Sequence, residues 1–252
     1  MYTTTNMIVD AFMFYNELDV LEFRLKLLDP HVDRFVLVES EVTHAGGPKP
    51  LFFEQNKERY TKWLPKIKHI VLTAEEAPKD PNPWLREKYQ RSIITRGMED
   101  LQDDTIVMVS DVDEIPDMSK LTMDFKSCVS VHMYMFEYSF DYMFVGEPWI
   151  GTSIMHLKSL RSLGANFFRD TRWRHPVIPY AGWHLSSFGD AAHVVNKLTT
   201  FAHANDPHSI DWDVETFTDV ISKGLHTDGK TKLIPRPENI HLPDGWEKFT
   251  RQ

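Results

Sequence analysis

Residues 105–116 read TIVMVSDVDEIP, an apolar run that stops abruptly at Ser110 and three acids. This pattern is typical of a buried parallel strand whose C-terminal end opens onto a ligand site. Like charges this close repel one another, so a cation or hydrogen-bond donors must lie among them. The stretch therefore predicts an α/β protein with a polar site at the end of this strand.

Asp111 and Asp113 are separated by one residue, so in an extended segment both side chains project to the same side. Such a pair suits a hard divalent ion that also holds phosphate oxygens. The alternative is an acidic turn that caps a helix after Pro116. The preceding apolar strand favours the ligand site.

Length and composition limit the possible classes of protein. The chain has 252 residues, of which 42% are hydrophobic and 12% aromatic, enough to bury the core of one large domain over residues 1–252. The formal net charge is -9, which argues against a partner made of duplex nucleic acid, since such binders need a basic face. An anionic substrate would need local arginines, lysines or a metal.

Cys128 is the one cysteine, so a disulfide framework within the chain is excluded and a reducing compartment is expected. The N-terminal segment lacks a basic region, and its apolar run is broken at Asp10. No segment reaches the roughly 18 apolar residues of a membrane span. We therefore expect a soluble, unanchored cytoplasmic protein.

The first half of the chain alternates between strand and helix patterns. Strands are predicted at 7–15, 34–39, 66–72 and in the opening stretch 105–116, with helices at 20–28, 56–63 and 84–101. Four such units predict a mostly parallel, doubly wound sheet with its site at the strand ends.

Three of the four predicted strands deliver polar side chains to one edge of the sheet. Asn16, Glu17 and Asp19 follow the first strand, Glu39 ends the second, and the acids of residues 111–114 end the fourth. This concentration indicates a ligand with hydroxyl groups, an amide-rich ring and a metal.

The second half is rich in aromatic residues and has no βαβ rhythm. Residues 129–144 predict a long strand or hairpin, which either lines the site or forms core. A strand is expected at 149–156, and helices at 157–163 and 191–203. Residues 164–176 are dense in arginine and aromatics.

Five segments in order resemble glycosyltransferase family 17: FYNELDVLEFRLKLL, FVLVESEVTHAGGPKPL, WLREKYQRSII, VMVSDVDEIP and AGWHLSSFG. The resemblance runs from about residue 11 to residue 203. It implies a GT-A fold and inverting transfer of a sugar, with N-acetylglucosamine expected, from a UDP-sugar to a glycan hydroxyl. It also implies Mn²⁺, or Mg²⁺, at the D-x-D motif. Residues 7–125 would then bind the nucleotide sugar, and residues 126–252 the carbohydrate acceptor. Because the chain lacks the anchor and stem of Golgi members, we expect a bacterial or viral relative.

The resemblance assigns roles to particular residues. Asp113 would bind the metal directly, Asp111 would bind it through water or hold the ribose, and His184 would contact the metal or the diphosphate, with His203 as the alternative. The other expected donor contacts are Asn16, Glu17, Glu39, Arg86 and Arg91. Each has a structural alternative: a packed histidine, a strand-end cap or a surface charge.

Inversion requires a carboxylate outside the metal cluster that takes the proton of the acceptor hydroxyl. Asp170 is our first choice, because it lies between aromatic residues suited to stacking on a sugar. Asp190, Glu137 and Asp141 are rivals. The structural alternative is a salt bridge between Asp170 and one of its neighbours Arg169, Arg172 and Arg174.

Three other functions stay open. A transferase of the same fold could use another nucleotide-sugar donor, a metal-dependent phosphohydrolase would also place acids at strand ends, and a carbohydrate-binding module would use the tryptophans and tyrosines alone.

Overall fold

The computed structural model describes residues 6–202 and 212–250. His203, the alternative metal contact, lies outside these ranges. The strands are β1 Ile8–Phe14, β2 Arg34–Ser40, β3 Ile67–Leu72, β4 Ile106–Asp111, β5 Glu114–Pro116, β6 Val129–Glu137, β7 Tyr142–Met143, β8 Trp149–His156, β9 Val177–Ile178, β10 Gly182–Ser186 and β11 Ile234–Pro235. The α-helices are α1 Leu18–Leu28, α2 Phe52–Gln55, α3 Pro83–Ser92, α4 Leu157–Leu163, α5 Ala165–Thr171, α6 Ala191–Thr200 and α7 Val214–Ser222. The 3-10 helices are η1 Lys57–Tyr60, η2 Leu64–Lys66, η3 Ile93–Met98, η4 Met118–Lys120, η5 Arg172–Arg174 and η7 Trp246–Phe249.

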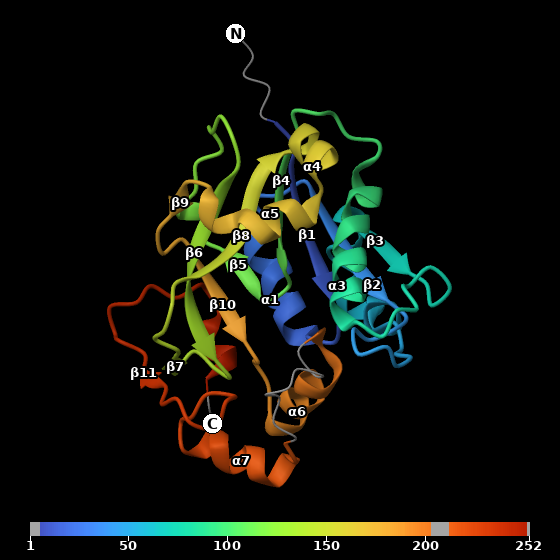
Figure 1. Ribbon diagram of the computed structural model, residues 1–252. Coiled ribbons are helices and arrows are strands. Elements are labelled where there is room, and N and C mark those ends of the chain that lie inside the picture. Colours follow the sequence, from blue (N-terminus) through green and yellow to red (C-terminus); the bar gives the residue numbers. More distant parts are fainter. Residues whose placement is uncertain (1–5, 203–211, 251–252) are drawn as a thin grey trace.

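One sheet runs through both halves of the described chain (Figure 1). Its N-terminal half is parallel, in the order β3-β2-β1-β4, with helices in the crossovers as the sequence predicts. This arrangement confirms the α/β fold. It brings the C-terminal ends of β1, β2 and β4 to one edge of the sheet.

The expectation of a mostly parallel sheet is wrong for the C-terminal half. Strand β8 pairs antiparallel with both β4 and β6, and β7 pairs antiparallel with β6. The cause is the connection between β6 and β8, which contains no crossover helix, and short connections join antiparallel neighbours. Residues 129–144 accordingly form the expected hairpin, β6 and β7.

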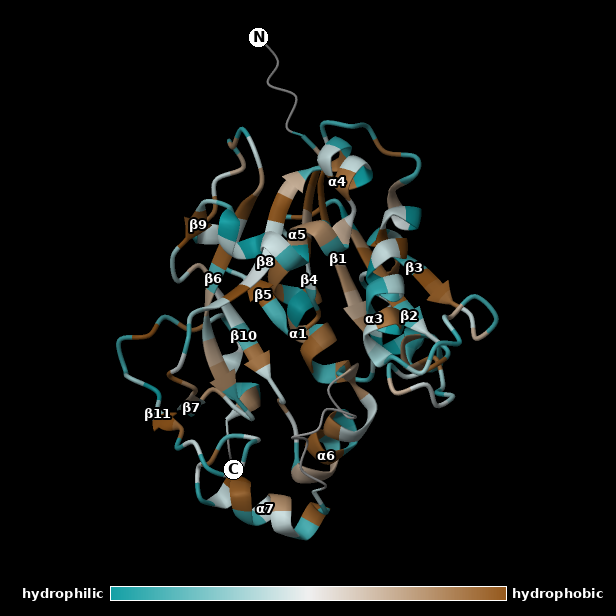
Figure 2. Ribbon diagram, in the orientation of Figure 1, coloured by the Kyte–Doolittle hydropathy of each residue, from teal (hydrophilic) through white to brown (hydrophobic). Residues whose placement is uncertain are grey.

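Alternating side chains on the central strands pack into two hydrophobic cores, one on each face of the sheet. On β1, Phe12 and Phe14 pack on the face covered by α1, whereas Val9 and Ala11 pack on the face covered by η3 and α4. Hydrophobic shades accordingly concentrate on the central strands in Figure 2. A sheet covered on both faces leaves its strand ends as the place for a ligand.

The predicted helix at 84–101 divides into α3 and the 3-10 helix η3. The change occurs between Ser92 and Ile93. Within η3, Gly97 lies so close to the side chain of Val36 on β2 that a Cβ atom at Gly97 would clash with it. The tight approach presses this segment onto the sheet. It also fixes α3 beside the strand ends.

A buried ion pair fixes the turn after β4. Arg24 of α1 and Asp10 of β1 are both fully buried, with two hydrogen bonds of 2.6 and 2.8 Å. The same guanidinium donates to the carbonyl oxygens of Asp111, Val112 and Glu114 at 2.8–3.1 Å. Arg24 therefore holds the backbone that carries the D-x-D acids.

None of the helices in residues 6–202 and 212–250 combines the length and the apolar content needed to cross a lipid bilayer.

We expect Arg24→Met to lower the free energy of unfolding by about 3–5 kcal/mol, because it leaves Asp10 charged and buried without its partner. Denaturant titration measures the loss. Asp100→Asn is the control, since it breaks the exposed pair between Arg34 and Asp100 and should hardly move the unfolding midpoint. Equal losses in both variants would show that the buried pair has no special role.

Candidate active site

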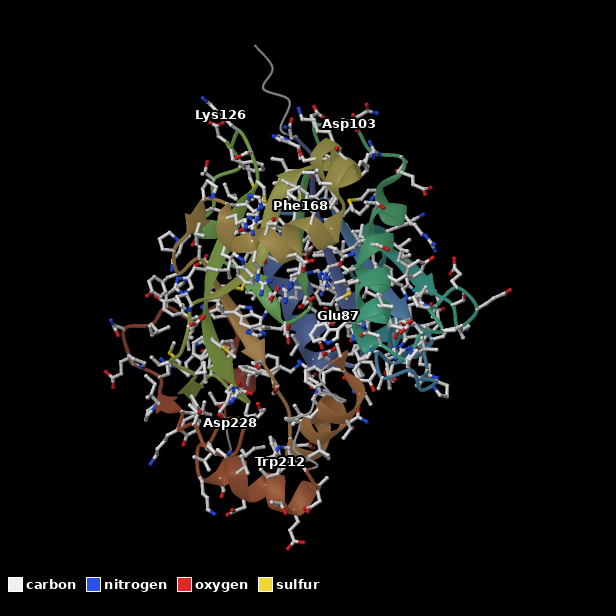
Figure 3. All side chains as sticks on the ribbon, viewed as in Figure 1. Glu87, Asp103, Lys126, Phe168, Trp212 and Asp228 are labelled. Atoms are coloured by element: carbon white, nitrogen blue, oxygen red, sulfur yellow. The ribbon has the colours of Figure 1, made fainter. Side chains whose placement is uncertain are left out.

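A cavity of about 490 Å³ opens at the C-terminal ends of β1 and β4. Its walls come from those strand ends, from α3, from α5 and η5, from β10 and from α6. Figure 1 shows α6 at the end toward which β1 and β10 point, and Figure 3 places Glu87, one of the lining residues, near the middle of the molecule. The cavity therefore lies where the sequence predicts a site.

Asp111 lies between two arginines. Its Oδ2 accepts a hydrogen bond from Arg169 at 2.7 Å, and its Oδ1 lies 3.4 Å from Arg91. Burial by itself would raise the pKa of Asp111, but Arg169 and Arg91 together hold it below its usual value. Arg169 also bridges to Glu114 at 2.7 and 3.0 Å. Asp111 is thus ionised and neutralised by the chain itself.

Asp113 has a different pair of partners. Lys197 of α6 donates to its Oδ2 at 2.9 Å, and Nε2 of His184 lies 3.7 Å from its Oδ1. Burial opposes ionisation, but Lys197 and His184 hold the pKa of Asp113 well below its usual range. The Lys197 ammonium thereby fixes α6 to the strand end. Oδ1 of Asp113 makes no hydrogen bond to His184, because 3.7 Å is too long for one.

The donor set fits a divalent cation. Oδ1 of Asp113 and Nε2 of His184 face each other beyond hydrogen-bond distance, and carboxylate oxygen and imidazole nitrogen are both ligands of Mn²⁺-like ions. The His184 ring is oriented by stacking on Trp149, with ring centroids 4.4 Å apart. Among the described residues, no three or more His, Cys, Asp or Glu side chains lie close enough together to hold a metal ion. An ion at this position would therefore have few ligands among the described side chains.

Two of the expected donor contacts, Asn16 and Glu17, follow the C-terminal end of β1, near the cavity. Glu17 lines it, accepts from the backbone N–H of Asn16 at 3.0 Å, and lies 3.9 Å from Lys197. Asn16 instead turns toward Asn196 on α6, with 3.4 Å between Nδ2 and Oδ1. These contacts attach α6 to the first strand.

Two other predicted residues, Arg86 and Glu39, are buried but do not line the cavity. Arg86 donates to the carbonyl oxygen of His44 at 2.6 Å and also bonds to Asp80 and Pro81. Glu39 accepts from the backbone N–H of Phe53 at 3.0 Å and lies 3.2 Å from His69. Both therefore stabilise loops in this state of the protein.

Asp170 lies on α5, lines the cavity and is 55% exposed. Its partner is Lys88 at 3.1 Å, and not one of the neighbouring arginines that the sequence suggested as alternatives. The rival Asp190 caps α6 by accepting from the backbone N–H of His193, and the rival Asp141 is bonded within its turn to Ser139. Neither of these two lines the cavity.

Four residues of the site, Trp149, Arg169, Arg172 and Lys197, were missed by sequence reasoning as binding groups. The arginines lie in the Arg-rich stretch 164–176, whose density was the available signal. Lys197 gives no signal, because one lysine on an amphipathic helix is normally a surface charge. Its partner Asp113 lies 84 positions away in the sequence.

Glu137, the third rival, is the last residue of β6, lies beside Ser186 of β10 in the sheet and is fully buried. Neither carboxylate oxygen has a hydrogen-bond partner in the described ranges, and the nearest histidine nitrogen, Nε2 of His226, is 3.7 Å away. Burial raises the pKa of Glu137 to about 7. The residue is poised to hold a proton in the folded protein near neutral pH.

Glu137→Gln should stabilise the protein at about pH 8 and change little at about pH 4. Between about 4.5 and about 7 the folded wild type retains a proton that the unfolded chain releases, so its free energy of unfolding falls as pH rises. The expected difference between variant and wild type above this window is at most about 3 kcal/mol. Denaturant titrations across the pH range measure it. A difference that does not change with pH would contradict the raised pKa.

Known proteins provide an independent comparison. A family model described as glycosyltransferase family 17 matches residues 1–230. The beta-1,4-mannosyl-glycoprotein 4-beta-N-acetylglucosaminyltransferases of Rattus norvegicus and Homo sapiens are each 28% identical over 115 residues, which is 43% of this chain. The match spans only 21% and 22% of those two proteins.

The similarity to solved structures is weaker. Galactosyltransferase LgtC in complex with donor and acceptor sugar analogues aligns at 13% identity over 96% of this chain and 99% of its own, with a TM-score of 0.36. The catalytic domain of Drosophila beta1,4galactosyltransferase 7 aligns at 11% identity over 71% and 68%, with a TM-score of 0.31. Scores this low add nothing about activity. The family match covers most of the sequence and is decisive: the chain belongs to glycosyltransferase family 17.

Proposed function

We propose that this protein is an inverting glycosyltransferase that moves a sugar, N-acetylglucosamine, from a UDP-sugar to a hydroxyl of a glycan acceptor. The observation that carries the proposal is the meeting of Asp113, His184 and Lys197 in one cavity at the strand ends. A leaving diphosphate needs cations at this position, and the cavity volume of about 490 Å³ suits a nucleotide sugar. The cytosol is the proposed location, in keeping with the lone, free Cys128.

A divalent ion, Mn²⁺ or Mg²⁺, belongs to the proposal. Asp113 and His184 would hold it, with Asp111 acting through water, and when bound it would neutralise the charge that builds on the departing diphosphate. Glu17 and the end of β1 would face the nucleoside. Lys197 supplies a second positive charge to the same side of the cavity.

Asp170 is the proposed general base. As the acceptor oxygen attacks the anomeric carbon, its proton passes to the carboxylate of Asp170, and the bond from that carbon to the diphosphate oxygen breaks on the opposite face. The ion pair with Lys88 orients this carboxylate at the cavity rim. Its 55% exposure leaves room for an acceptor to enter from solvent.

Membership of a glycosyltransferase family argues against a metal-dependent phosphohydrolase and against a carbohydrate-binding module, since neither of these functions explains the match over residues 1–230. A different nucleotide sugar remains the alternative donor. A panel of nucleotide sugars, assayed for slow hydrolysis without acceptor, distinguishes these donors.

Asp113→Asn should abolish Mn²⁺-dependent binding of UDP, because the neutral amide loses the charge that attracts the ion and Lys197. Isothermal titration with UDP, with and without Mn²⁺, measures the change. Asp103→Asn is the control: Asp103 is exposed and lies at the far edge of the molecule in Figure 3. If Asp113→Asn binds UDP as the wild type does, the acids of the strand end do not hold the donor.

Asp170→Asn should reduce the transfer rate by about two to four orders of magnitude, since the amide cannot accept the proton. UDP affinity and melting temperature should stay near the wild-type values. Lys88→Met provides the matched control, because it breaks the same ion pair and keeps the base. Equal rate losses in the two variants would mean that the pair, and not the carboxylate, supports activity.

A further inference from the structure

Six lysines and arginines line the cavity, and five of them have a carboxylate oxygen within 4 Å. The five pairs are Lys49 with Glu39, Lys88 with Asp170, Arg91 with Glu87 and Asp111, Arg169 with Asp111 and Glu114, and Lys197 with Asp113 and Glu17. Arg172 is the exception: among the described residues no carboxylate oxygen lies within 4 Å of its guanidinium, and Glu114 and Asp111 act on it only from a greater distance. A cation that is partly removed from water and left without a counter-ion is unfavourable.

The structure holds Arg172 in place without neutralising it. One amino group donates to the carbonyl oxygen of Arg169 at 2.6 Å. The guanidinium carbon lies 4.1 Å from the ring centroid of Trp173 and 5.9 Å from that of Trp149. Its Nε is buried and has no hydrogen-bond partner. The side chain is therefore oriented and retains unused donor capacity.

The surroundings also disfavour the charge. Burial, and then the positive charge of Arg169, lower the pKa of Arg172 to about 10. Arginine remains protonated at neutral pH even so. The folded protein thus maintains a positive charge that an anion entering the cavity would stabilise.

Arg172 lies on the side of the cavity where the donor's anionic group is expected. Trp149 contacts both its guanidinium and the ring of His184, which faces Asp113. A planar guanidinium with free N–H groups matches the oxygens of a phosphate group. Arg91, which the sequence suggested for this role, is already paired with Glu87 at 2.6 Å.

We propose that Arg172 is the diphosphate anchor of the nucleotide-sugar donor, held unpaired in the free protein so that the diphosphate becomes its counter-ion. The proposal rests on the function proposed above and names the group that binds its donor. Arg172 binds the leaving diphosphate and takes no proton.

Isothermal titration of UDP, uridine and inorganic pyrophosphate tests the anchor in the wild type, Arg172→Met, Arg172→Lys and the control Arg174→Met. Arg174 belongs to the same turn, η5, and is exposed. Arg172→Met should weaken UDP and pyrophosphate by about tenfold to a hundredfold, the range for a hydrogen bond to a charged group. Uridine affinity should not change, and Arg172→Lys should recover part of the loss. The control should match the wild type.

The melting temperature provides a second readout. Removing a cation that lies beside Arg169 and has no counter-ion should leave the melting temperature of Arg172→Met unchanged or raise it. A lower melting temperature with unchanged UDP affinity would make Arg172 a structural residue and overturn the anchor. Equal loss of uridine and UDP would also overturn it, since the nucleoside carries no diphosphate.

The outcomes separate the anchor from the donor assignment. If the wild type binds pyrophosphate but not UDP, and Arg172→Met loses pyrophosphate, the anchor stands and the uridine donor is wrong. If the wild type binds UDP and Arg172→Met binds it equally well, the donor stands and the anchor is wrong. Binding of neither ligand by the wild type overturns both.

Discussion

The buried ion pair between Arg24 and Asp10 is the interaction on which the site depends. Burying two charges is unfavourable unless their remaining donors and acceptors are satisfied. Here the guanidinium meets that condition with the Ser110 hydroxyl at 2.6 Å and the carbonyl oxygens of the turn after β4. The stability of the pair and the shape of the D-x-D turn are therefore determined by the same bonds, and the acids at the strand end occupy fixed positions.

The second constraint on the site is the balance of charge within the cavity. Asp111 and Asp113 stay ionised in a buried place because Arg169 and Arg91 reach the first and Lys197 the second, from α5, α3 and α6. Arg169 also pairs with Glu114. These three helices belong to different parts of the chain. Their attachment to the strand end is electrostatic as much as hydrophobic, so the acids organise the C-terminal half around the N-terminal sheet.

The sequence was informative where one strand or helix carries the whole signal. The parallel half of the sheet and the acids after β4 follow from local apolar runs and their ends, and the GWH segment indicated His184. It was uninformative where two distant segments combine. The antiparallel β8, the partner of Asp170 and the pairing of Lys197 with Asp113 depend on tertiary contacts. Arg86 and Glu39 show the converse, since polar residues near a predicted strand end can instead satisfy loop carbonyls and amides.

Lys197 has a thermodynamic consequence for any ion that enters the site. Because its ammonium already occupies one oxygen of Asp113, an incoming cation competes with a charge that belongs to the protein, and its measured affinity reflects the difference between the two. A diphosphate bound nearby offers the ammonium another anion and so reduces that competition. Ion and nucleotide would then each strengthen the binding of the other by the same factor, as linkage requires. In the proposed mechanism, one lysine on α6 would thereby couple the binding of the ion to the binding of the nucleotide.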